Sequence, residues 1–142
     1  MNAKALHQAI YNRLNNASVT SLLSTSYAPL VSIFSSVPQA ANSGDNSYFP
    51  FITIGNNTIS AYDVKDSVGG SASVQIDIWA RSRSVLDIKE IADAVDARLR
   101  RQPLTITGAT HITTELQDSQ DMDDPDGKTS RIMLRYNVLW LT

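Results

Sequence analysis

The feature that most constrains this chain is an unbroken order of patterns in its second half. Residues 73–81 alternate between apolar and polar side chains, which is typical of a strand with one buried face. Residues 84–101 repeat apolar side chains at helical spacing, and residues 112–140 contain two further alternating runs around Asp124-Pro125-Asp126-Gly127. A strand, a helix and a two-stranded ribbon in this order predict an α+β fold with a helix packed on one face of an antiparallel sheet.

The helix over residues 84–101 has signals at both ends. Ser84 is a candidate N-cap with Asp87 three residues later, a capping-box-like pair. The last turn carries three arginines, which suit the negative end of a helix, and Pro103 stops the helix. Its predicted apolar stripe is Ile88, Ile91, Ala92, Val95 and Leu99, and the arginines are Arg98, Arg100 and Arg101.

On the strands predicted to pack against this helix, every second side chain faces the core. The core-facing residues predicted on the first of them are Val74, Ile76, Ile78 and Ala80. Those predicted on the last two are Ile112, Thr114 and Leu116, then Ile132, Leu134, Tyr136, Val138 and Trp140.

The first half of the chain predicts smaller elements. Residues 3–15 read as an amphipathic helix, and Ser18 is a candidate cap for a short second helix. Residues 30–34 and 49–55 are β-prone, whereas residues 39–47 and 63–70 are polar stretches expected to be exposed and mobile, with Gly69-Gly70 as a flexible hairpin connection. We therefore expect one domain over residues 1–142, with an antiparallel or mixed sheet, an N-terminal helix and one long helix on one face.

Composition excludes several classes of protein. The chain has 142 residues, a net charge of −2 and no cysteine, so it holds no disulfide and no thiolate metal site. No run approaches the roughly 20 apolar residues of a membrane span, and the N-terminus lacks the apolar core of a signal peptide. We expect a protein made and folded in a cytoplasm, with no membrane association and no specific binding of nucleic acid.

The residues that could carry chemistry do not form a recognisable site. An EF-hand loop starting at Asp121 would need glycine sixth and glutamate twelfth, but Asp126 and Ile132 stand there. His7 and His111 accompany no nucleophile motif and are expected on the surface or on a helix face, and no lysine follows Gly69-Gly70 as a phosphate loop requires. We therefore predict no catalytic residue, cofactor or metal, and interpret the acidic run as a solvated hairpin tip.

The sheet's second face has an unusual mixture of side chains. Polar groups on it alternate with Trp79, Met133 and Leu139, and Arg135 lies between the last two. Aromatic residues, Met and Arg are enriched at protein interfaces. The sequence therefore predicts a subunit interface that uses Trp79, Met133, Arg135 and Leu139.

Four stretches in order along the chain resemble the tail-completion proteins of long-tailed phages, a family similar in fold to tail terminators and found also in gene transfer agents. They are the helical opening of residues 5–23, the stretch from Ile33 through Val37-Pro38 to Phe49-Pro50-Phe51-Ile52, residues 78–95, and the turn at residues 124–129 leading into Leu134-Arg135-Tyr136. The longer loop at residues 39–48 departs from the pattern.

The resemblance implies a function without catalysis. Such a protein is a virion component that forms a ring, usually a hexamer, which caps the tail tube, ends its polymerisation and joins the tail to the head connector. The expected partners are other copies of the chain, the tail tube protein and the head connector, and DNA passes through the bore without specific binding. The alternatives are a head-closure or neck protein on the capsid side and, in another class, a small bacterial ligand-binding or hydrolase domain with a deep polar pocket.

The polar segments at residues 39–47, 63–70 and 118–128 are the predicted contacts to the head and the tail. Segments that order on binding can fit a partner whose symmetry differs from that of the ring. The acidic tip either docks to such a partner or lines the bore, where its carboxylates would repel DNA phosphates. Its residues are Asp121, Asp123, Asp124 and Asp126.

Overall fold

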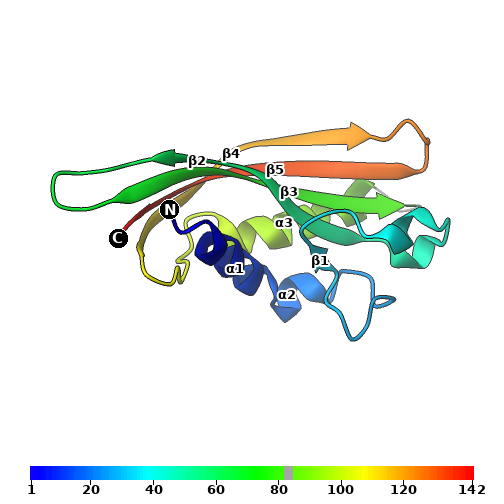
Figure 1. The fold of residues 1–142 in the computed structure, drawn as a ribbon. Coiled ribbons are helices and arrows are strands. Elements are labelled where there is room, and N and C mark those ends of the chain that lie inside the picture. Colours follow the sequence, from blue (N-terminus) through cyan, green and yellow to red (C-terminus); the bar gives the residue numbers. More distant parts are fainter. Residues whose placement is uncertain (82–84) are drawn as a thin grey trace.

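The computed structural model describes residues 1–81 and 85–142. Figure 1 shows an elongated molecule in which long strands lie over a layer of helices. The helical elements are α1 (Ala3–Leu14), α2 (Ala17–Thr20), α3 (Val85–Leu99) and two short 3₁₀ helices, η1 (Gln39–Asn42) and η2 (Asn46–Tyr48). The strands are β1 (Ile33–Phe34), β2 (Phe51–Ala61), β3 (Gly69–Arg81), β4 (Thr110–Asp123) and β5 (Thr129–Leu141).

The strands form one five-stranded sheet in the order β1-β2-β3-β5-β4. The two-residue β1 pairs parallel with β2, and the three remaining pairs are antiparallel. The predicted α+β class is confirmed, and the sheet is mixed only through β1. The two hairpins, β2–β3 and β4–β5, turn at opposite ends of the molecule (Figure 1).

The helices cover one face of the sheet, here called the inner face (Figure 1). The core-facing residues predicted on β3 and β5 are each at most 4% exposed. They pack in one cluster with Ile88, Ile91, Val95 and Leu99 of α3, as predicted, and with Leu6, Ala9, Ile10 and Leu14 of α1. Burying each large apolar side chain contributes about 1.5–3 kcal/mol, so this matched pair of surfaces is the main source of stability.

Arginines join the ends of α1 and α3. Arg13 Nε donates a hydrogen bond to the carbonyl oxygen of Arg98 (2.7 Å), and Arg98 Nε donates to the carbonyl oxygen of Arg13 (2.9 Å). Each cation therefore satisfies a terminal carbonyl group of the other helix. Arg100 and Arg101 follow the end of α3 rather than lying within it, and the predicted N-cap Ser84 lies outside the described residues.

Two predictions in the first half of the chain are wrong in detail. The cap of α2 is Asn16 and not Ser18, because the Asn16 side chain accepts hydrogen bonds from Ser18 N (3.0 Å) and Ser18 Oγ (2.7 Å). The strand predicted over residues 30–34 is reduced to β1, since Leu30 N is hydrogen-bonded to the carbonyl oxygen of Tyr27 in a turn and the Leu30 side chain is 67% exposed.

The segment at residues 39–47 is more structured than its composition predicts. It contains η1 and η2, and Ala41 is buried with Phe49 and Phe51 in a second, smaller apolar cluster. The rings of Tyr27 and Phe34 pack against this cluster, 4.8 Å apart. The aromatic side chains on either side of the polar stretch therefore hold it against the sheet.

Gly69 and Gly70 are not a flexible connection, because both lie in β3. A Cβ atom on Gly70 would lie 2.3 Å from the indole ring of Trp140, and one on Gly69 would lie 2.5 Å from the carbonyl oxygens of Trp140 and Tyr62. The glycines are required by this close approach.

The alternation predicted for β4 fails at Ile112. A bulge between His111 and Thr113 shifts the register, so that His111 pairs with Trp140 and Thr114 with Val138. Thr114 is buried, whereas Ile112 is 47% exposed. The extra residue in the bulge turns His111 towards the inner face and Ile112 away from it, the reverse of the prediction.

Candidate interaction surface

The outer face of the sheet is the side opposite the α-helices, and β3 and β5 contribute to it the residues predicted as an interface. On β5 the relevant side chains alternate with the core residues, and on β3 they lie directly opposite. Trp79 pairs with Arg131, Met133 with Asp77, Arg135 with Gln75 and Leu139 with Ser71. Trp79, Met133 and Arg135 therefore occupy consecutive positions on one face, whereas Leu139 lies six residues beyond Met133, about 20 Å along the strand.

Trp79 is held by neighbours within its own chain. Its ring stacks on Phe51 with centroids 6.1 Å apart, and its Nε1 donates to Thr53 Oγ1 (3.0 Å). The guanidinium carbon of Arg131 lies 4.9 Å from the ring centroid. Trp79 is half-buried as a result, so it joins the second apolar cluster and presents only part of its ring to a partner.

A buried carboxylate lies beside this tryptophan. Asp77 is 6% exposed, accepts hydrogen bonds from Gln75 Nε2 (3.1 and 3.3 Å), and lies 3.9 Å from Arg131 Nε. Burial raises the pKa of Asp77, while Gln75 and Arg131 lower it. Sequence reasoning missed Arg131, although the alternation of β5 extends back to it from Met133 and Arg135.

Met133 and Arg135 differ in accessibility. Met133 is 4% exposed, and Arg135 Nη2 contacts its sulfur at 3.7 Å. The Arg135 side chain is 40% exposed and forms an ion pair with Asp118 (3.8 Å). Arg135 and the half-buried Leu139 therefore offer more surface to a partner than Met133 does.

The acidic tip contains two kinds of aspartate. Asp126 is a structural residue of the turn, because its carboxylate accepts hydrogen bonds from Lys128 N (2.8 Å), Thr129 N (2.9 Å) and Thr129 Oγ1 (2.8 Å). These bonds, with a contribution from Arg81 at 3.6 Å, lower the pKa of Asp126 to about 2.

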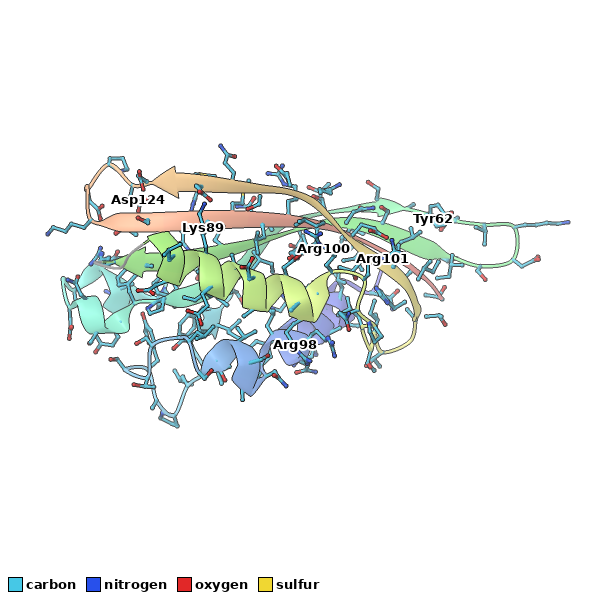
Figure 2. All side chains as sticks on the ribbon, turned by 180° about the vertical axis from the view of Figure 1, so that it is seen from behind. Tyr62, Lys89, Arg98, Arg100, Arg101 and Asp124 are labelled. Carbon is cyan, nitrogen blue, oxygen red and sulfur yellow. The ribbon has the colours of Figure 1, made fainter. Side chains whose placement is uncertain are left out.

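Of the other aspartates of the tip, Asp121 and Asp123 are exposed and Asp124 is half-buried. Asp121 forms an exposed ion pair with Lys89 (3.5 Å). Asp123 and Asp124 form no ion pair with the described residues, and Figure 2 places Asp124 at the end of the hairpin. The tip therefore carries two carboxylates that are available to an external cation.

The histidines are placed in different settings. His7 Nε2 lies 3.4 Å from Ser35 Oγ on the surface. His111 is half-buried, contrary to prediction: Leu104 N donates to its Nδ1 (3.3 Å), so its Nε2–H donates to Thr114 Oγ1 (2.7 Å). Burial lowers the pKa of His111, and these bonds give it a structural role.

Within residues 1–81 and 85–142, no group of three His, Asp or Glu side chains is arranged to hold a metal ion. None of the helices described there is long and apolar enough to cross a membrane.

Comparisons with known proteins agree with the family predicted from the sequence. Residues 8–140 match the family described as tail completion protein gp17. The fold is similar to a chain in the virion of a native gene transfer agent particle, with a TM-score of 0.81 and 18% identity over 99% of this chain and 97% of that one. A second solved chain has a TM-score of 0.56 and 13% identity over 95% and 94% of the two chains.

No curated protein sequence matches this one. The family match nevertheless extends over nearly the whole sequence, and the fold similarity extends over the same residues. The chain therefore belongs to the tail completion protein gp17 family and is a structural protein of a phage-type tail, a component of the virion.

Proposed function

We propose that this tail protein forms a ring, with six copies as the expected number, that caps the tail tube. The ring ends polymerisation of the tube and joins the tail to the head connector. The family match over residues 8–140 carries this proposal. The shape of the molecule supports it, because the sheet has one face without α-helices and a hairpin at each end for contacts with neighbours (Figure 1).

The outer face is the proposed contact between copies. Trp79, Met133, Arg135 and Leu139 lie on it, and Arg135 and Leu139 carry most of the accessible surface. Trp79 and Met133 act mainly by keeping that surface flat and ordered, since both are enclosed by their own neighbours. We propose no catalysis and no cofactor for this ring.

The hairpin tip of β4–β5 is the proposed contact with a head or tail partner. Asp124, at the end of the hairpin, would bind basic groups of that partner, while Asp126 holds the turn in shape. DNA passes through the bore without specific contact, consistent with the net charge of −2.

The test of the ring is capping of tail tubes, viewed by electron microscopy. Arg135→Glu combined with Leu139→Asp should keep the fold and abolish capping, because both side chains are accessible. Glu90→Lys on the exposed side of α3 is the control and should cap normally. If the double variant caps tubes as well as the parent does, the outer face is not the contact between copies. Binding of the parent to head connectors but never to tube ends would favour a head-closure role.

The test of the hairpin tip is head–tail joining. Asp124→Asn removes one charge from the tip and leaves the bonds of Asp126 intact. Loss of joining with tails of normal length supports docking, whereas joined particles that eject DNA slowly support a bore position. Fully infectious particles with normal ejection would exclude both roles.

A further inference from the structure

The loop between β2 and β3 carries an exposed apolar cluster. We call residues 62–68 the arm. Its apolar side chains are among the exposed large ones of the protein: Tyr62 is 43% exposed, Val64 44% and Val68 62%. Single exposed apolar residues are ordinary, but three within one seven-residue loop make it a candidate contact site.

The arm is ordered by hydrogen bonds of its own. Val64 and Ser67 form a β-bridge, Asp63 Oδ1 accepts from Gly69 N (3.2 Å), and Thr142 N donates to the carbonyl oxygen of Val68 (2.7 Å). These bonds hold the backbone while the valine side chains remain exposed. Little entropy would be lost when such an arm binds.

A cavity lined by both apolar and charged side chains lies near the other end of the molecule. Ala80, Ile88, Met122 and Ile132 line it between α3 and the β4–β5 hairpin, and its volume is about 180 Å³. A cavity of roughly 150 Å³ accommodates benzene, so this space is large enough for one branched side chain. Lys89 and Asp121, 3.5 Å apart, lie at its edge.

The arm and the cavity lie at opposite ends of the same sheet. Figure 2 shows Tyr62 beside the β2–β3 loop, whereas Lys89 and Asp124 lie towards the tip of β4–β5. The arm therefore cannot fill the cavity of its own chain. A chain with a projection at one end and a hollow at the other is suited to head-to-tail contacts, which close into a ring when the rotation allows.

One charge in the arm has an opposite charge at the cavity. Lys65 in the arm forms no ion pair with the described residues, and Asp123, which also lines the cavity, forms none either. The two cations around the cavity, Lys89 and Arg131, already form ion pairs with Asp121 and Asp77 of their own chain. A partner that supplies valines together with one cation is therefore a better match than nucleic acid, whose phosphates the aspartates would repel.

We propose that the arm of one copy occupies the cavity of a neighbouring copy, with Val68 inside it and Lys65 beside Asp123. This inference rests on the proposed ring and identifies a contact within it that the outer face does not provide. Arg131 connects the two surfaces, since it lies over Trp79 and also lines the cavity.

The chain has no cysteine, so single cysteines report this contact directly. Copies with Val68→Cys are mixed with copies with Lys89→Cys and treated with a short bismaleimide, in solution and on capped tubes. We expect a cross-linked heterodimer in at least tenfold excess over that formed with Arg100→Cys. Arg100 is a matched control, because it lies just beyond the other end of α3, is 49% exposed against 52% for Lys89, and also forms an ion pair with an aspartate.

A second variant tests the apolar part of the contact. Val64→Asp in the copy carrying Val68→Cys should reduce the heterodimer at least tenfold, whereas Leu30→Asp, at another exposed apolar residue, should not. Both variants should melt like the parent. Equal cross-linking to Lys89→Cys and Arg100→Cys, or efficient Val68-to-Val68 cross-linking, would overturn the inference.

The mass of the parent protein and its binding to tube ends separate this inference from the ring itself. Self-association or capping without the selective heterodimer would overturn the arm contact and leave the ring in place. A parent protein that neither associates nor caps tubes would overturn the proposed function, and the arm contact with it.

Discussion

The two faces of the sheet are both buried at their centres, but in different ways. On the inner face, Ile76 and Ile78 are 0% exposed because α1 and α3 cover them. On the outer face, Asp77 is 6% and Met133 4% exposed although no helix lies over them (Figure 1). There, long side chains such as Arg131 and Trp79 lie across the strands and cover their neighbours.

This difference shows what each face contributes. The inner face gains stability from removing apolar surface from water, which requires no ionised side chain. The outer face depends on polar pairs whose net contribution is small. It is therefore suited to present a defined surface to partners, and changes on it should cost less stability than changes on the inner face.

The largest effect is expected from Ile91→Asp on the inner face. Ile91 is 2% exposed in the core, so the variant would bury a carboxylate without a partner and should lose at least about 4 kcal/mol of unfolding free energy. Urea denaturation followed by circular dichroism measures it. Glu90→Ala, one residue away on the exposed side, should change stability by less than about 0.5 kcal/mol. A variant that melts like the parent would contradict the position of α3.

A smaller loss of stability is expected at Gly70, where the backbone of β3 lies against the ring of Trp140. Gly70→Ala would place a Cβ atom 2.3 Å from the Trp140 ring and should cost about 1–3 kcal/mol. Gly55→Ala is the matched control in β2, since its Cβ atom would lie 3.5 Å from the carbonyl oxygen of Ser35, an ordinary contact. Equal melting temperatures for the two variants would mean that Trp140 moves aside easily.

On the outer face, Arg131→Met should cost about 1–2 kcal/mol. It leaves the buried carboxylate of Asp77 without a cation and removes the guanidinium from Trp79. The pKa of Asp77, already raised by burial, should rise further, which a pH titration by NMR detects. Arg135→Met removes only a pair that is 40% and 48% exposed, and should cost less than about 1 kcal/mol. If Arg135→Met lost more stability than Arg131→Met, then Arg135, and not Arg131, would be the arginine that stabilises the outer face.

The elements with strong periodicity could be predicted from the sequence. The alternation of residues 74–80 and the helical spacing of residues 88–99 each identify one buried face, and these two surfaces meet in the structure. Failures came where one residue changes the register, as at the bulge beside His111, or where composition conceals packing, as with Ala41 and Gly70. Such features depend on contacts between distant segments, which local patterns do not contain.

The candidate surface was predicted less completely. Alternation correctly placed Trp79, Met133 and Arg135 on one face. It could not distinguish the nearly enclosed Met133 from the accessible Arg135, because that difference depends on Arg131 and Asp118 across the strands. The aspartates of the tip were likewise a single run in sequence, but only the structure separates the turn residue Asp126 from Asp123 and Asp124.

The smallest effect is expected at the inner edge of β4, where His111 brings a titratable group close to the core. Burial lowers its pKa, so the folded protein prefers neutral His111, and Nδ1 must stay unprotonated to accept from Leu104 N. Unfolded histidine binds a proton near pH 6.5. As pH falls through this value the unfolded state takes up more protons, so stability should decrease, and the loss should end below the folded pKa.

Asp77 acts in the opposite direction at lower pH. Its pKa is raised in the folded protein, so its protonation on acidification favours folding and offsets part of the loss. The contribution of His111 is therefore obtained by difference, from urea denaturation of the parent and of His111→Gln between pH 5 and 8. The parent should lose more stability than the variant as pH falls from 7 to 5.5, because glutamine cannot be protonated but can still accept from Leu104 N. Parallel curves would show that the half-buried ring is protonated in the folded protein as readily as in the unfolded chain.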